Sequence, residues 1–219
     1  MRTIVLLIAF VACSLPAASQ EKEVFSYRNN ILLFNRNYVD TFYVDKNSGF
    51  VKPSLPTVEK SITSKTGSKY DVKMYRYMDF ENDPGDFHVI DIYYGGKRIF
   101  SQKFDLGWDY FYTRETYERS VSKPFELIEL TNNRLAIVFT GITITSEPPM
   151  ITVILLENGT ASLVYNKPSF LNKVTRNADS VVFDMQLDNG EIPYEGAQPG
   201  DPKARRLTFK NGLIYFQAF

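Results

Sequence analysis

The densest cluster of aromatic side chains surrounds the only tryptophan of the chain. Trp108, Tyr110 and Tyr112 offer aromatic faces on which a sugar ring can stack. Asp109 and Arg114 lie beside them in the sequence and could hydrogen-bond the hydroxyls of that sugar. These five residues form the candidate ligand-binding site, although aromatic residues also fill β cores, and core packing is the favoured explanation of the cluster.

The chain contains only one histidine and one cysteine. Catalysis or metal binding that depends on imidazole or thiolate groups therefore has almost no candidate residues. In an extended strand, His88 shares a face with Ile90 while Asp91 points to the opposite side, so a local dyad is not expected. No Gly-x-Ser-x-Gly motif is present to supply a serine nucleophile. We therefore expect no catalytic residue, no metal site and no cofactor.

Acidic residues are numerous, but their spacing has little specificity. Residues 79–86 place carboxylates at alternate positions, as calcium loops do, yet Pro84 stands where the EF-hand pattern requires glycine. An acidic turn between two strands is the favoured interpretation. A glycosidase would need two carboxylates facing each other across a cleft. The candidates for such a pair are Asp105, Asp109, Glu115, Glu118, Glu195 and Asp201.

The N-terminal residues have the pattern of a secretory signal peptide. Arg2 supplies the positive charge, Ile4–Leu15 form the apolar run, and Ala17 and Ser19 are the small residues before the cleavage point. Residues 1–19 are therefore the predicted signal peptide, and cleavage would leave a mature chain without cysteine. An exported domain without disulfides is more typical of bacteria than of animals.

The residues Phe10-Val11-Ala12-Cys13 resemble a bacterial lipobox, in which the cysteine is lipidated and anchors the protein to a membrane. Phe10 departs from the aliphatic residue that is usual at that position. Plain cleavage after Ser19 is favoured, and lipidation of Cys13 stays as the alternative.

The composition narrows the class of protein. Lys+Arg and Asp+Glu both number 25 in 219 residues, so the formal charge is zero, which excludes an electrostatic nucleic-acid binder. Hydrophobic residues make up 44% of the chain, enough for a sizeable core. No uncharged apolar run reaches the roughly 20 residues of a transmembrane helix, so none is predicted.

Short β-type runs separated by turn dipeptides predict an all-β fold. Each of the dipeptides tolerates the positive φ angles of tight hairpin turns. The expected two-residue turns are Gly95-Gly96, Asn158-Gly159, Asn189-Gly190 and Asn211-Gly212, and a further hairpin is expected at Thr131–Asn133.

Alternation of residue types predicts which strands are buried. Apolar and polar residues alternate in Tyr70–Tyr75 and Val181–Asp188, which indicates strands with one solvent-exposed face. Leu135–Phe139 and Met150–Leu156 are apolar on both faces and are the expected centre of the core. Two short helices are possible, at Tyr112–Ser120 and Ser169–Asn177.

We expect residues 20–219 to form one β-rich domain, an antiparallel β-sandwich or an open barrel built from hairpins, with at most two short helices. The polar stretches Asp45–Lys69 and Pro193–Arg205 are the expected long loops. No repeat of fixed period is visible. The last residues, Leu213–Phe219, resemble the aromatic-terminated final strand of bacterial outer-membrane barrels.

These observations predict an exported, non-enzymatic protein of the bacterial periplasm or cell envelope that binds a protein or a glycan. A carboxylate-dependent hydrolase of envelope polysaccharide is one alternative, and a small outer-membrane β-barrel is another. The partner's identity and the oligomeric state lie beyond the sequence.

Overall fold

The computed structural model describes residues 19–40, 52–76, 87–104, 123–141, 150–187 and 203–219. Within these residues the chain is almost entirely extended, with one 3-10 turn, η1 (Arg36–Tyr38). The strands are β1 (Lys22–Glu23), β2 (Phe25–Arg28), β3 (Ile31–Phe34), β4 (Val58–Thr63), β5 (Lys69–Arg76), β6 (Phe87–Tyr94), β7 (Lys97–Lys103), β8 (Glu126–Thr131), β9 (Arg134–Gly141), β10 (Met150–Glu157), β11 (Thr160–Pro168), β12 (Phe170–Arg176), β13 (Ser180–Gln186), β14 (Ala204–Lys210) and β15 (Leu213–Ala218).

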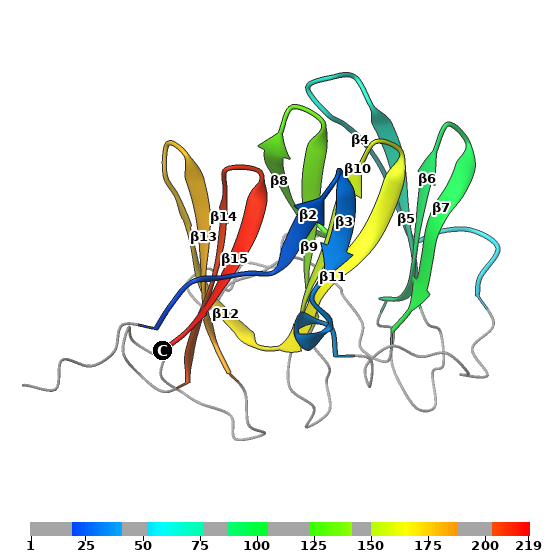
Figure 1. The fold of residues 1–219 in the computed structure, drawn as a ribbon. Coiled ribbons are helices and arrows are strands. Elements are labelled where there is room, and N and C mark those ends of the chain that lie inside the picture. The colour runs from blue at the N-terminus through cyan, green and yellow to red at the C-terminus, as the bar shows by residue number, and fades with distance from the viewer. Residues whose placement is uncertain (1–18, 41–51, 77–86, 105–122, 142–149, 188–202) are drawn as a thin grey trace, which may run out of the picture.

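The strands form three successive antiparallel meanders and one separate hairpin (Figure 1). The meanders are β4–β7, β8–β11 and β12–β15, each in chain order, and β1 adds a fifth strand beside β15. The hairpin is β2–β3, and β2 contacts β15. None of the described sheets closes into a barrel, so the all-β antiparallel prediction is confirmed in its sandwich form.

The sheet β8–β11 lies between the other two and is apolar on both faces. Alternation along β9 directs Leu135, Ile137 and Phe139 into the core shared with β4–β7. Ala136 and Val138 enter the core shared with β12–β15. All five side chains are buried, which confirms the predicted two-sided burial of this region.

The outward faces of the two end sheets are polar. Glu59 and Lys73 face each other across β4 and β5 and form an ion pair at 2.8 Å. Asp184 and Arg206 do the same across β13 and β14, also at 2.8 Å. The predicted solvent-exposed faces of β5 and β13 are thus confirmed in part, because Lys73 and Asp184 are partly exposed, whereas Tyr75 and Gln186 on the same faces are buried.

Most of the predicted hairpin turns are confirmed. Gly95-Gly96 joins β6 to β7, Asn158-Gly159 joins β10 to β11, and Asn211-Gly212 joins β14 to β15, with positive φ at every one of these residues. Thr131–Asn133 connects β8 to β9 as expected. Asn189-Gly190 lies outside the described residues.

Two expectations about elements were wrong. Ser169–Asn177 is not a helix, because Phe170–Arg176 form strand β12 and pair with β13. Leu171 and Val174 lie on either side of a bulge in β12, and both contact the core. The pairing of β12 with β13 outweighs any local helical preference. The polar stretch Asp45–Lys69 contains strand β4, so it is not a continuous loop. The possible helix at Tyr112–Ser120 lies outside the described residues.

Candidate functional site

The ligand-binding residues predicted from the sequence lie outside the described part of the structure. Trp108, Tyr110, Tyr112, Asp109 and Arg114 all lie outside the described residues. The same holds for Cys13, for the acidic residues 79–86 and for all six acids considered for a glycosidase pair. His88 belongs to strand β6, but its side chain is not among those described. The candidate site therefore has to be built from the described side chains.

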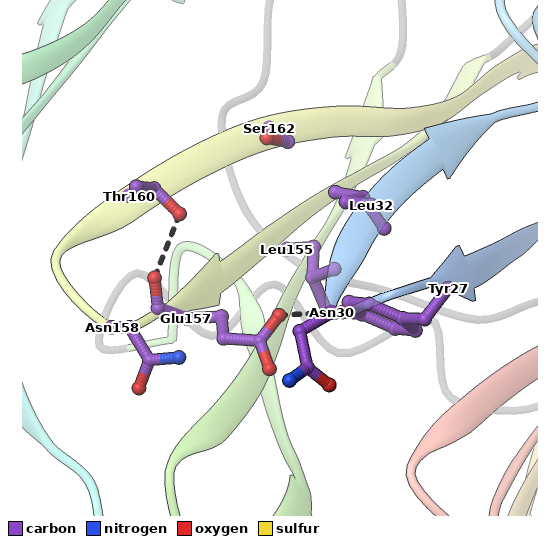
Figure 2. Close-up of a pocket in the computed structure, with 8 residues that line it drawn as sticks. All are labelled: Tyr27, Asn30, Leu32, Leu155, Glu157, Asn158, Thr160 and Ser162. Carbon is purple, nitrogen blue, oxygen red and sulfur yellow. Dashed lines mark hydrogen bonds between the residues drawn. The ribbon is translucent and has the colours of Figure 1, made fainter.

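A pocket of about 240 Å³ lies between the β2–β3 hairpin and the β10–β11 hairpin (Figure 2). Both hairpins turn through residues with positive φ, Asn29-Asn30 in the first and Asn158-Gly159 in the second. Such turns suit asparagine and glycine, which tolerate the left-handed region. The pocket is lined by Tyr27, Asn30, Leu32, Leu155, Glu157, Asn158, Thr160 and Ser162.

The central group of the pocket is the Glu157 carboxylate. The Tyr27 hydroxyl donates to Oε2 of Glu157 at 2.5 Å (Figure 2). Arg134 donates to Oε1 of Glu157 from Nε at 3.1 Å and from Nη2 at 2.7 Å. The guanidinium also lies over the Tyr27 ring, 4.3 Å from its centroid. Three side chains from three strands thus hold one another in a fixed arrangement.

The strand register explains why Arg134 and Glu157 meet. They are direct cross-strand neighbours at the ends of β9 and β10, where opposite charges attract. Arg134 also donates to the Gly212 carbonyl at 2.5 Å, which ties the pair to the β14–β15 turn. The side chains of Arg134 and Glu157 are each 16% exposed, so the ion pair is largely shielded from solvent.

Tyr27 remains protonated at physiological pH. Burial raises the pKa of its hydroxyl, and the hydrogen bond to Glu157 raises it further, although the positive charge of Arg134 acts in the opposite direction. The hydroxyl therefore acts as a permanent donor to Glu157.

Gly159 fixes the β10–β11 turn against the neighbouring sheet. Its backbone N–H donates to the Tyr70 hydroxyl at 3.1 Å. Its φ is +76°, and a Cβ at this position would lie 2.8 Å from the Tyr94 ring. The turn therefore requires glycine for both its conformation and its close packing.

Several polar groups of the pocket are available to a ligand. The Asn30 amide and the Ser162 hydroxyl have no hydrogen bond to any described residue. Asn158 accepts from Asn133 through Oδ1 at 3.0 Å, which leaves its amide N–H groups unused. Leu32 and Leu155 supply an apolar wall beside them. The pocket thus offers neutral donors and acceptors next to apolar surface.

The pocket gives no support to acid–base catalysis. Glu157 is the one carboxylate among its described lining residues, and both of its oxygens already accept hydrogen bonds. A glycosidase needs two acids about 5–9.5 Å apart. Among the described residues, moreover, no group of three or more His, Cys, Asp or Glu side chains could hold a metal ion.

A second polar cluster lies on the outer face of β4–β7. Asp91 is fully buried, and it accepts from Lys52 Nζ at 2.6 Å and from Ser101 Oγ at 2.6 Å. Arg98 lies 3.7 Å away, and Lys52 Nζ sits 4.3 Å from the centroid of the Tyr75 ring. Every oxygen of this carboxylate is engaged, so the cluster anchors the segment before β4 to the sheet.

Neither the pocket nor the Asp91 cluster was predicted from the sequence. The Asn158-Gly159 turn was a visible signal for one wall of the pocket. Tyr27 and Glu157, however, are 130 residues apart, and no local pattern links them. In the described part of the chain, no helix is long and apolar enough to cross a membrane. Comparison with known protein families, curated proteins and solved structures found no match.

Proposed function

We propose that this chain is an exported, non-enzymatic protein of the bacterial periplasm or cell envelope, and that it binds a glycan in the pocket beside Glu157. The signal-peptide pattern of residues 1–19 supports export. The observation that carries the binding proposal is the pocket. Its frame is held by Tyr27, Arg134 and Glu157, and the Asn30 amide, the Asn158 amide N–H groups and the Ser162 hydroxyl have no partner among the described residues.

A glycan matches the chemistry of this pocket. Sugar hydroxyls both donate and accept. The Asn30 amide and the Ser162 hydroxyl can do the same, and the Asn158 amide can donate through its N–H groups. The C–H face of a sugar is apolar, which suits the wall formed by Leu32 and Leu155. The volume of about 240 Å³ is below the ~300–1,000 Å³ of drug-sized sites, so one terminal sugar ring is the expected occupant.

A binding role fits the geometry better than a hydrolytic one. The guanidinium of Arg134 and the hydroxyl of Tyr27 both donate hydrogen bonds to the Glu157 carboxylate. A carboxylate engaged in this way can still accept hydrogen bonds from sugar hydroxyls through its remaining lone pairs.

Saturation-transfer NMR with a panel of envelope oligosaccharides tests the proposal. We expect transfer to the terminal sugar of at least one of them. Ser162→Leu should fill the pocket and abolish the signal. Ser54→Leu is the matched control, because Ser54 is an exposed serine outside the pocket. A signal that survives Ser162→Leu would contradict binding at this site, and cleavage of any oligosaccharide would contradict the non-enzymatic role.

Export and anchoring need a separate experiment. The chain is produced with its own leader in a bacterial host, and the intact mass of the mature protein is measured. A mass that begins at Gln20 and is unchanged by Cys13→Ala supports a free exported protein. A lipid-shifted mass that is lost in Cys13→Ala would instead assign the protein to a membrane anchor.

A further inference from the structure

The outer edge of β3 is apolar and unpaired. β3 consists of Ile31, Leu32, Leu33 and Phe34, and it pairs with β2 only, among the strands that the structure describes. Ile31 is 65% exposed, Leu33 43% and Phe34 50%. A free strand edge presents N–H and C=O groups that can pair with another extended chain. Such an edge is normally protected by its shortness, by charged residues, by proline or by bulges; β3 is four residues long and has no charged residue or proline.

The other sheet edges of the described residues carry that protection. β7, β8, β11 and β12 lie in ladders with a bulge or a register shift. Every edge strand except β3 also has charged residues. These are Lys22 and Glu23 in β1, Arg28 in β2, Glu59 and Lys60 in β4, Lys97 and Arg98 in β7, Glu126 and Glu129 in β8, Lys167 in β11, and Lys173 and Arg176 in β12. The lack of protection at β3 is therefore a local feature and not a general property of the fold.

Two exposed arginines flank β3 in the sequence. Arg28 precedes the hairpin turn and Arg36 follows β3, and both are exposed. Neither forms an ion pair with a described residue, and residues 24–39 contain no aspartate or glutamate. An apolar edge between two unneutralised arginines is complementary to an apolar segment with acidic ends.

We propose that β3 is the docking edge for an extended, apolar segment of a partner protein that carries acidic residues at both ends. The segment adds an antiparallel strand to β3, so main-chain hydrogen bonds provide affinity. Its alternate apolar side chains lie beside Ile31 and Leu33, and its acidic ends meet Arg28 and Arg36. This goes beyond the proposed glycan site and does not depend on it, because Leu32 faces the pocket while Ile31 and Leu33 alternate to the other side.

The test uses the full chain and fluorescein-labelled synthetic peptides, with binding followed by anisotropy. We expect EVTVTVE to bind with a dissociation constant in the range of about 10–100 μM. EVTPTVE should fail to bind, because proline removes a main-chain donor. KVTVTVK should bind at least about fivefold more weakly at low salt, because its ends repel the arginines.

Variants locate the peptide on β3. Leu33→Lys should weaken EVTVTVE binding by about tenfold or more, because a charge at the edge opposes pairing. Leu55→Lys is the matched control, since Leu55 is 78% exposed and lies outside this hairpin. The double variant Arg28→Glu and Arg36→Glu should reverse the preference toward KVTVTVK. Circular dichroism verifies that each variant is folded.

Four results would overturn the proposal. The first is no binding of EVTVTVE at about 1 mM, and the second is equal binding by Leu33→Lys. The third is a dimer in sedimentation that Leu33→Lys dissociates, which would make a second copy the occupant. The fourth is co-sedimentation with phosphatidylglycerol vesicles without peptide binding, which would make a lipid surface the occupant. Ser162→Leu should leave peptide binding unchanged, so failure of the glycan site and failure of the strand edge are distinguishable.

Discussion

The buried carboxylate of Asp91 leads to a quantitative prediction for Lys52→Met. Asp91 is fully buried, and Lys52 binds it at 2.6 Å with a side chain that is 31% exposed. Removing one partner of a buried ion pair costs roughly 3–5 kcal/mol, because the other charge stays buried without compensation. Arg98 at 3.7 Å and Ser101 at 2.6 Å remain close to Asp91 and compensate in part. We therefore expect Lys52→Met to lower the free energy of unfolding by about 2 kcal/mol.

Urea denaturation, followed by tryptophan fluorescence and by circular dichroism, measures this loss. Asp91→Asn is the comparison variant, because it keeps an acceptor for Ser101 and frees Lys52 to reach solvent. It should cost only about 1 kcal/mol. The double variant should lose less than the sum of the two single losses, since both remove the same interaction. Additive losses, or a loss below about 0.5 kcal/mol for Lys52→Met, would refute this reasoning.

The same ion pair has a defined pH dependence. Burial alone would lower the pKa of Lys52, but the hydrogen bond and the negative charge of Asp91 outweigh burial and raise the pKa. A folded-state pKa above the unfolded value of about 10.4 means that the stabilisation is complete below about pH 10 and is lost as the pH rises through the folded-state pKa. The difference in stability between the wild type and Lys52→Met should therefore shrink above about pH 10.

Four further variants test the pocket and the layered core. Tyr27→Phe removes the donor to Glu157 and should cost about 1 kcal/mol at neutral pH. Because the pKa of Tyr27 is raised, its contribution is lost only as the pH rises above about 10, so urea titrations of Tyr27→Phe should show a shallower alkaline decline than the wild type. Gly159→Ala should lower the thermal midpoint, with a cost of about 1 kcal/mol or more from its positive φ, and an unchanged midpoint would contradict the turn geometry. Ile137 and Val138 lie on opposite faces of β9. Ile137→Ala and Val138→Ala should each lower the free energy of unfolding, measured by urea denaturation, by about 2–4 kcal/mol. A near-neutral result for either variant would mean that one face of the middle sheet is not packed.

The local patterns that predicted the fold correctly were those with a direct physical cause. Glycine and asparagine in Gly95-Gly96, Asn158-Gly159 and Asn211-Gly212 tolerate positive φ, so these dipeptides marked hairpins regardless of their surroundings. The continuous apolar runs of β9 and β10 could be stable only with both faces covered, which placed them at the centre.

The elements that the sequence did not reveal are edge strands. β4 has the sequence VEKSIT, in which Ile62 is the one buried position, so its pattern is that of a polar loop. β12 is interrupted by a bulge between Leu171 and Lys173, which breaks the alternation that would identify a strand. Both segments become strands because they form main-chain hydrogen bonds with an adjacent strand, β5 for β4 and β13 for β12. Such pairing depends on tertiary structure and not on the local sequence alone.

The repeated meander was hidden for a similar reason. The first strands of the three sheets are β4, β8 and β12, which begin at Val58, Glu126 and Phe170. The number of residues from one of these starting points to the next is unequal. A search for a fixed period therefore finds nothing, because the connections differ in length while the order of the strands is the same. The layered arrangement becomes visible only when the sheets pack against one another.

By itself, the sequence determined the all-β class, most hairpin turns, the two-sided burial of the middle sheet and the expectation of export, because each depends on local conformation or on the order of residue types. Tertiary structure alone decided the pocket, since Tyr27 lies 130 residues before Glu157 and meets the Arg134–Glu157 pair only when the β2–β3 hairpin packs beside β10 and β11. It also decided that Lys52 pairs with the buried Asp91 and that β3 pairs with β2 alone among the described strands. Burial, charge pairing and strand neighbours depend on which segments meet in space, and no local pattern specifies that.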